Sequence, residues 1–314
     1  MRVVRPIALL ALVSVVAACG GSVTDRESSP SALQDEAVTV ASFDFAESEL
    51  LAELYSQALE DEGFSIERAF NLGPREFVMP ALASGLVEFV PEYAGTALQF
   101  LNLGESSGTA DVASTHDALV RALDGSMLTA LAPAPAQDAN GFVATRETAE
   151  RLDLRAISDL SAVAQGLVLG GPPECPTRPL CLAGLERLYG LTFGDFLPLD
   201  AGGPVTRQAL AQGHVDVALL FTTDPSILRD DLVVLTDDRR MQPAENVVPL
   251  IRTELAHRFG PDLVRAVDEV SQRLTTDGLR ELNAMVATGP LPLPAVAAQW
   301  LSAEGLVAAQ QADP

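Results

Sequence analysis

The stretch VEFVPEYAGTALQFL, residues 87–101, joins an apolar run typical of a buried strand to an apolar run at helical spacing. Tyr93 stands at the junction, next to Glu92, and is one of only three tyrosines in the chain. In open α/β sheets, ligands bind at the carboxyl ends of strands. The stretch therefore predicts a strand–helix unit of an α/β sheet in which Tyr93 faces a ligand cleft.

Outward from this unit, short apolar strands continue to alternate with helices of ten or more residues. Gly63 and Gly85 stop two of the helices, and Pro74 stands early in one of them. Strands are predicted at 37–42, 64–70 and 87–93, and helices at 47–63, 74–85, 95–104 and 115–131. The alternation predicts a sheet covered by helices on both faces.

A break in composition at 133–141, PAPAQDANG, separates this block from a second one. The second block has predicted strands at 142–146, 167–171, 215–221 and 232–238, and helices at 147–152, 181–190 and 204–213. A strand within 242–252 and helices at 260–275, 276–288 and 293–306 then return to the first block. We expect an α/β protein of two lobes: 37–138 and 242–314 form the first, and 139–241 form the inserted second. Two crossings between lobes predict a hinge and a cleft.

The amino terminus predicts export. Arg2 and Arg5 precede a short apolar run at 7–18, which is too short to span a bilayer and ends in small residues before Cys19. We interpret 1–18 as a lipoprotein signal peptide and Cys19 as the lipidated first residue of the mature chain. The alternative is an ordinary signal peptide with a chance cysteine. Residues 19–36, rich in Ser, Gly, Asp and Glu, are predicted to be a flexible tether.

The charge balance excludes some partners. The chain has 43 acidic residues against 20 basic ones, all of them arginine, for a formal net charge of −23. Nucleic acid binding needs clustered basic residues, so no nucleic acid partner is expected. The same charge disfavours electrostatic docking on anionic lipid.

The remaining cysteines, Cys175 and Cys181, flank a five-residue segment that contains two prolines. Outside the cytoplasm two nearby cysteines usually pair, so we predict a disulfide that stiffens one loop. A metal site would need more ligands, and the three histidines are scattered far from this pair. No metal or other cofactor is expected.

Motifs of catalysis and of nucleotide binding are missing from the sequence. It has no G-x-S-x-G, H-E-x-x-H, P-loop or G-x-G-x-x-G pattern, and its acidic pairs are typical of solvated surface in so acidic a chain. The sequence therefore does not favour an enzyme.

Predicted strand ends instead carry aromatic and hydroxyl residues suited to binding. Ligand contacts are predicted at Ser42, Asp44, Tyr93, Thr96, Asn140, Phe142, Thr206, Phe221 and Thr223. Aromatic faces attract a cation, most of all a quaternary ammonium, whose methyl groups donate no hydrogen bonds. The carboxylate of a zwitterion would suit the helix start at Gly95–Thr96. For each aromatic residue alone, core packing is the alternative.

At this point the chain resembles a known family, the substrate-binding proteins of osmoprotectant importers of the ABC type for glycine betaine, choline and carnitine. The segments that carry the resemblance are 38–64, 71–98 with its PEYAGT motif, 141–160, 199–224 and 235–252. The resemblance covers about residues 38–306. The segment 170–190 looks like the form of this segment in an actinobacterial branch of the family. It implies a type II periplasmic-binding-protein fold of two lobes with an aromatic cage in the cleft.

When the family motifs are carried over to this chain, the walls of that cage would be Tyr93, Phe142 and Phe221. At the last two positions the family often has Tyr instead of Phe. A further cage Tyr is missing, and Thr206 or Arg207 stands in its place. A Gln near the first helix start is replaced by Ser48. An arginine in a cage wall would repel a cation, unless it held an anionic group or pointed away.

The resulting hypothesis is a monomeric binding subunit, anchored by lipid to the outer face of the cytoplasmic membrane. It would capture a small quaternary ammonium solute such as glycine betaine and deliver it to an ABC permease with ATPase subunits. One alternative is the same role for a less cationic solute, for instance an aromatic or sulfur-containing metabolite. Another is a sensor or adhesion lipoprotein outside transport.

Overall fold

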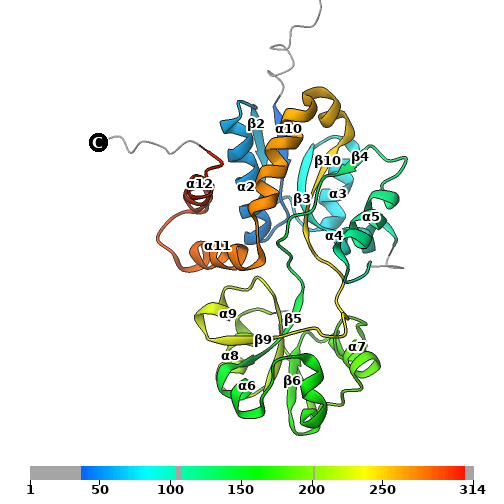
Figure 1. Cartoon of the computed structure of the whole chain (residues 1–314), viewed down its shortest axis with the longest axis vertical. Helices are drawn as coiled ribbons and strands as arrows, with labels where there is room; N and C mark the ends of the chain where they lie inside the picture. Colours follow the sequence, from blue (N-terminus) through cyan, green and yellow to red (C-terminus); the bar gives the residue numbers. More distant parts are fainter. Residues whose placement is uncertain (1–36, 104–107, 201, 308–314) are drawn as a thin grey trace, which may run out of the picture.

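The computed structural model describes residues 37–103, 108–200 and 202–307, which form two mixed β-sheets flanked by helices (Figure 1). The predicted signal peptide, tether and Cys19 lie outside these residues. The first sheet has the strand order β2-β1-β3-β10-β4 and the second β7-β6-β8-β5-β9. We call the parts built on them the first and second lobes. The predicted α/β fold with two mixed sheets is confirmed.

The strands are short, and each sheet contains one antiparallel strand among parallel ones. The antiparallel strands are β10 and β5, and each lies between two strands of its own sheet. In the first sheet the strands are β1 (Val38–Ala41), β2 (Ile66–Ala69), β3 (Phe89–Tyr93), β4 (Leu128–Ala130) and β10 (Val247–Arg252). In the second they are β5 (Asn140–Thr145), β6 (Val168–Gly171), β7 (Asp195–Pro198), β8 (Val217–Phe221) and β9 (Leu232–Leu235).

Helices cover both faces of the first sheet, and the carboxyl-terminal helices return to it (Figure 1). Its helices are α2 (Ala46–Asp61), α3 (Arg75–Ser84), α4 (Ala94–Leu101), α5 (Val112–Ala122), α10 (Thr253–Arg273), α11 (Thr276–Thr288) and α12 (Leu293–Ala303). Those of the second lobe are α6 (Arg146–Leu152), α7 (Leu182–Gly184), α8 (Pro204–Ala211) and α9 (Ser226–Arg229). In the described part of the chain, no helix has the length and apolar character to cross a membrane.

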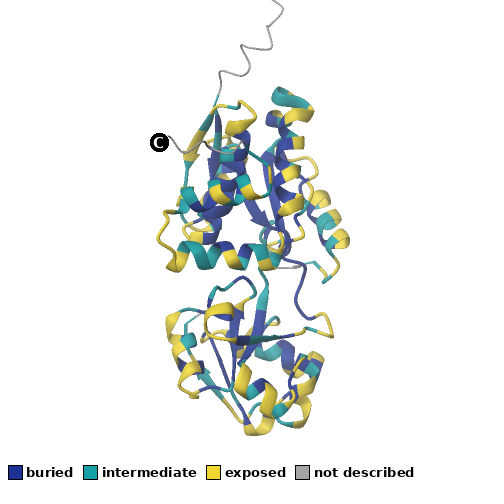
Figure 2. Cartoon of the chain, turned by 60° about the vertical axis from the view of Figure 1, so that its left-hand side comes forward, coloured by how far each residue is buried: buried dark blue, intermediate teal, exposed yellow. Residues whose placement is uncertain are grey.

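Alternation along β3 explains how one strand serves two hydrophobic cores. All five of its residues are buried, as expected of a central strand with helices on both sides. Phe89 packs into the core with α2 and α10, whereas Val90 packs into the core with α3, α4 and α5. Figure 2 shows the buried strands at the centre of each lobe and the exposed residues outside.

The structure corrects two predicted elements and adds a strand that was not predicted. The helix predicted at 115–131 ends at Ala122, because Gly125 adopts a φ of 73°, and Leu128–Ala130 form the edge strand β4 instead. The strand β7 was not predicted, because its Asp195 and Pro198 interrupt the apolar pattern. The helix predicted at 181–190 is one turn, α7, followed by a π-helix over Leu185–Tyr189. Cys175 and Cys181, just before it, form the predicted disulfide.

Two extended segments, 131–139 and 236–246, cross between the lobes and pair with each other. The backbone N–H of Ala134 donates to the Val247 carbonyl oxygen at 2.8 Å, and the Asp138 N–H donates to the Glu245 carbonyl oxygen at 3.0 Å. Such paired crossings restrict relative movement of the lobes to bending at these segments. The lobes also approach each other where α11 contacts α9 (Figure 1).

Candidate ligand-binding site

A pocket of about 530 Å³ lies between the two lobes, beside the first crossing. This volume is in the usual range for small-molecule sites. The first lobe, the crossing, the second lobe and α11 all contribute to its wall: Phe45, Ala46, Glu47, Arg75, Tyr93, Thr96, Asp138, Phe221, Thr223, Asp224, Pro225, Asn283, Val286 and Ala287. Because both lobes supply residues, bending at the crossings would open or close the pocket.

Three aromatic rings line the pocket. Tyr93 ends β3, Phe45 precedes α2, and Phe221 ends β8. The ring centroids of Phe45 and Tyr93 are 6.3 Å apart with an interplanar angle of 26°. Phe45 and Phe221 are 42% and 40% exposed, so a guest in the pocket can contact their rings. The rings offer apolar contact and electron-rich faces to a guest.

Glu47, in the first turn of α2, places a buried carboxyl group in the same wall. The Tyr93 hydroxyl donates to its Oε1 at 2.6 Å, and the Asn283 amide donates to its Oε2 at 2.5 Å. Burial is the main cause that raises the pKa of Glu47, because a charged carboxylate loses its hydration. The contacts join α2, β3 and α11 around one carboxyl group.

Asp138 supplies a second carboxyl group from the crossing between the lobes. The Thr223 hydroxyl, from the second lobe, donates to its Oδ1 at 2.7 Å. Burial raises the pKa of Asp138 well above its usual value, and the nearby charge of Glu47 raises it further. The pocket therefore holds two mutually interacting carboxyl groups, of which Glu47 is buried and Asp138 is half-buried.

Arg75 is a cation in the same wall, but its charge is compensated. Its Nε and Nη2 donate to the two carboxylate oxygens of Glu92 at 2.5 and 2.9 Å. Glu92 is fully buried, and the Arg75 guanidinium also lies 4.9 Å from the ring centroid of Phe43. This bidentate pair fixes α3 against the end of β3.

The helix start at Gly95–Thr96, predicted to receive a carboxylate of the ligand, is occupied by the protein itself. Glu245 accepts from the Thr96 N–H at 2.9 Å and from its hydroxyl at 2.8 Å. The Gly95 N–H donates to the Ala244 carbonyl oxygen at 3.1 Å. The second crossing thus caps α4, and burial raises the pKa of Glu245 to about 7.

Four of the nine predicted contact residues line the pocket: Tyr93, Thr96, Phe221 and Thr223. The structure places the other five elsewhere. Ser42 is fully buried, donates to the Phe43 carbonyl oxygen and accepts from the Asn71 N–H, so it braces a loop. Asp44 is exposed and outside the pocket wall.

In the second lobe, Thr206 is also fully buried, and its hydroxyl donates to Asp200. Phe142 is 1% exposed and belongs to the core of the second lobe, because its side chain lies on the inner face of β5. Asn140 donates to Gln242, and with Phe142 it lines a separate hollow of about 370 Å³. In this structure these residues hold the lobe together rather than face the pocket between lobes.

Arg207, which stands where the family resemblance implied a cage wall, is not among the residues that line the pocket. Its Nη1 lies 3.2 Å from Asp224 Oδ2 and donates to the Gly202 carbonyl oxygen. The ion pair with Asp224 compensates the charge of Arg207, so the predicted repulsion of a cation by this residue is removed.

Ten residues of the pocket wall were not predicted from the sequence, among them Phe45, Glu47, Arg75, Asp138 and Asn283. Acidic residues in the first turn of a helix are ordinary, so Glu47 gave no signal. Asn283 comes from a helix more than 200 residues away in the sequence. The pair of aromatics at Phe43 and Phe45, separated by an aspartate, was an available sign, although only Phe45 is exposed and Phe43 packs in the core.

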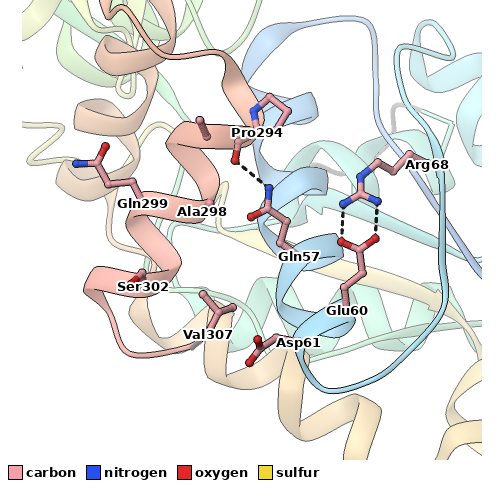
Figure 3. Close-up of a pocket in the computed structure, with 10 residues that line it drawn as sticks. Gln57, Glu60, Asp61, Arg68, Pro294, Ala298, Gln299, Ser302 and Val307 are labelled. Atoms are coloured by element: carbon pink, nitrogen blue, oxygen red, sulfur yellow. Dashed lines mark hydrogen bonds and ion pairs between the residues drawn. The ribbon is translucent and has the colours of Figure 1, made fainter. Parts of the chain in front are cut away.

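The described residues also enclose a larger hollow, of about 810 Å³, between α2 and α12 on the first lobe (Figure 3). Its charged residues pair with each other, since Arg68 donates to both carboxylate oxygens of Glu60. Gln57 donates to the Pro294 carbonyl oxygen across it. It has no exposed aromatic ring and no contact with the second lobe, so volume alone does not make it the candidate site.

Gly95→Ala is expected to destabilise the fold by about 1–3 kcal/mol. A Cβ at Gly95 would lie 2.8 Å from Glu245 Oε1 and 3.0 Å from the Ala244 carbonyl oxygen. The matched control is Gly166→Ala, where a Cβ meets nothing within 4 Å. Urea unfolding of both variants measures the difference, and equal stability would show that the capped helix start tolerates the added carbon.

Glu245 is expected to make the protein less stable as the pH rises. Its folded-state pKa of about 7 lies above the ordinary 4.5, so the folded state holds this proton more tightly than the unfolded chain does. Its stabilising contribution, on the order of 3 kcal/mol, is complete below about pH 4.5 and lost as the pH approaches 7. Urea unfolding between pH 5 and 7.5 should give a shallower pH dependence for Glu245→Gln than for the wild type; identical slopes would contradict this.

Two lobes joined by paired crossings, with a pocket between them, are typical of the solute-binding proteins of ABC importers. Comparison with known families specifies the group. Residues 36–303 match the OpuAC family, the substrate binding domain of ABC-type glycine betaine transport systems, and the chain belongs to this family. It is a transport substrate-binding protein, not an enzyme.

Relatives and solved structures agree with this assignment. The chain is 29% identical over 269 residues to the glycine betaine-binding protein YehZ of Escherichia coli (strain K12), covering 82% of this chain and 88% of that protein. The solved structure of apo YehZ superposes with a TM-score of 0.76 at 27% identity and covers 87% of this chain and 100% of its own. A glycine betaine/carnitine/choline ABC transporter structure, at 24% identity, gives a TM-score of 0.79 with 86% and 99% covered, which shows the shared fold. As a binding protein of an ABC importer, the chain acts outside the cytoplasm.

Proposed function

We propose that this protein captures a small quaternary ammonium solute in the pocket between its lobes. The observation that carries the proposal is the composition of the pocket wall: the rings of Phe45, Tyr93 and Phe221 stand with the carboxyl groups of Glu47 and Asp138 around one space of about 530 Å³. A desolvated cation gains about 2 kcal/mol or more from an aromatic face. The carboxyl groups add charge attraction that no apolar cavity would provide.

Several features support an importer role with lobe closure. The pocket draws residues from both lobes, and the crossings at 131–139 and 236–246 are the segments able to bend. We propose lobe boundaries of 37–138 with 242–314 for the first lobe and 139–241 for the second. The sheet memberships of β1–β4, β5–β9 and β10 support them.

The proposed delivery route is an ABC permease and its ATPase subunits, with the protein held at the membrane by lipidated Cys19. The sequence around Cys19 supports the anchor through its basic start, short apolar run and small residues. Radiolabelled fatty acid should be incorporated into the wild type and not into Cys19→Ala. Labelling of both proteins would place the modification at another residue, and labelling of neither would exclude it.

The ligand class is tested by calorimetry with glycine betaine, choline, carnitine and proline betaine. At least one is expected to bind, and at a ligand concentration one hundred times the dissociation constant it should raise the free energy of unfolding by about 2.7 kcal/mol. Phe221→Ala should weaken the same ligand, whereas Phe77→Ala, an exposed site outside the pocket wall, should not. If none of the four solutes gives heat or stabilisation, the proposed class is wrong and a less cationic solute is favoured.

A further inference from the structure

The charges of the pocket wall do not balance. Asp224 is paired with Arg207, and Arg75 is paired with Glu92, so these groups compensate each other. Among the described residues, no ion pair compensates Glu47 or Asp138. A guest therefore meets one buried and one half-buried acidic group, and no cation of the pocket wall that is free of its own carboxylate partner.

The donors of the wall are also directed to protein acceptors. Both donors of Thr96 go to Glu245, and the Thr223 hydroxyl goes to Asp138. The Tyr93 hydroxyl donates to Glu47. The Asn283 amide donates to Glu47 and to the Thr223 carbonyl oxygen, which uses both of its N–H groups.

The amino-terminal end of α2 also borders the pocket, and helix starts attract anions. Here the first turn of the helix carries Glu47 and Glu49, so its own carboxyl groups already complement the helix dipole. Within the part of the chain that the structure describes, no side chain caps the N–H groups of this helix start, but a carboxylate of the ligand bound there would lie next to Glu47. Like charges brought together in a desolvated site cost several kcal/mol.

We propose that this pocket, taken as the site of the proposed function, selects a permanently cationic solute without a carboxylate, of the choline class, over a zwitterionic betaine. Glu47 and Asp138 are the residues that determine this preference. Choline and glycine betaine share the trimethylammonium group that the aromatic rings contact, so the rings do not separate them. The carboxyl groups do, because in their ionised form they attract the shared cation and repel the carboxylate that only glycine betaine carries.

Protonation of the pair gives the preference a pH dependence. Burial raises the pKa of both carboxyl groups, and their mutual repulsion adds to it for Asp138, so the empty pocket favours bound protons on the pair. A bound cation favours the charged forms and displaces protons. The charged or titratable groups that face the pair are Tyr93 from β3, Glu245 from the second crossing, and Arg75, which is held by Glu92. Choline affinity should therefore rise with pH.

Calorimetry with choline and glycine betaine on the wild-type protein tests the preference. Choline is expected to bind at least about ten-fold tighter, which corresponds to about 1.4 kcal/mol. If glycine betaine binds as tightly as choline or tighter, this inference is overturned while the proposed quaternary ammonium function stands. If neither solute binds, the proposed function fails and the inference fails with it.

Variants identify the residues responsible. Glu47→Gln keeps the size of the side chain and is expected to lower the choline-to-betaine affinity ratio at least five-fold, and Asp138→Asn should act in the same direction. The control is Glu150→Gln, an exposed acidic residue of α6 outside the pocket wall, which should leave the ratio unchanged. Circular dichroism confirms folding of each variant. A ratio that is unchanged in both pocket variants would overturn the assignment to these carboxyl groups.

The pH dependence supplies an independent readout. From pH 6 to pH 8, choline affinity should rise by at least about three-fold for the wild type and by less for Glu47→Gln. Proton release on choline binding, measured by calorimetry in buffers of different ionisation enthalpy, should be smaller for Glu47→Gln. If choline affinity does not depend on pH and no protons are released, then choline does not displace a proton from Glu47 and Asp138, and this part of the inference is wrong.

Discussion

Arg75→Ala is expected to lower the free energy of unfolding by about 3–5 kcal/mol. The substitution leaves the carboxylate of Glu92 in place with no cation, and Glu92 is fully buried. A buried charge that loses its partner has given up its hydration without compensation. The loss also removes the guanidinium that packs over Phe43, so α3 loses its attachment to the end of β3. Urea unfolding of the unliganded protein measures the effect.

Two controls separate the buried pair from the loss of any arginine. Arg155→Ala removes a cation whose partner, Asp153, is equally exposed, and its cost should stay below about 0.5 kcal/mol. The double variant Arg75→Ala, Glu92→Gln removes the stranded charge and should recover part of the lost stability. If the single and double variants are equally unstable, then packing of the arginine side chain, and not the unpaired carboxylate, accounts for the loss.

Much of the fold was predictable because its signals are local. The apolar run ending at Tyr93, with a helical pattern directly after it, is sufficient to predict β3 and α4 at nearly their observed bounds. The edge strands β4 and β7 were not predictable in this way. Leu128–Ala130 is only three residues long, and its pairing with β10 depends on a strand more than a hundred residues later.

The pocket was only partly predictable, for a related reason. Tyr93 and Phe221 end strands, and strand ends of one lobe face the other lobe, so topology alone places them near the cleft. Phe142 also lies close to an end of its strand, β5. However, side chains alternate between the two faces of a strand, and the ring of Phe142 lies in the core of the second lobe. Glu245 shows the limit most clearly, because it caps α4 from the second crossing, 149 residues after Thr96 in the chain.

Tyr93→Leu is expected to weaken binding of a quaternary ammonium solute by at least about ten-fold. Leucine fills much of the buried volume but has no electron-rich face, and it cannot donate to Glu47 as the tyrosine hydroxyl does. Tyr93→Ala should weaken binding as much and should also destabilise the fold by about 3–5 kcal/mol, because Tyr93 is 5% exposed and packs in the core with α2. Calorimetry at a ligand concentration matched to the wild-type affinity measures binding, and urea unfolding measures stability.

Tyr93→Phe distinguishes the two roles of this side chain. Phenylalanine keeps the ring and its packing but removes the hydroxyl group, so affinity should stay within about three-fold of the wild type if the ring face contacts the cation. Affinity that falls as far in the phenylalanine variant as in the leucine variant would show instead that the hydrogen bond to Glu47 is the required feature. Affinity that is unchanged in the leucine variant would mean that Tyr93 belongs to the core alone, because a ring in contact with a cation cannot be exchanged for an aliphatic side chain without loss.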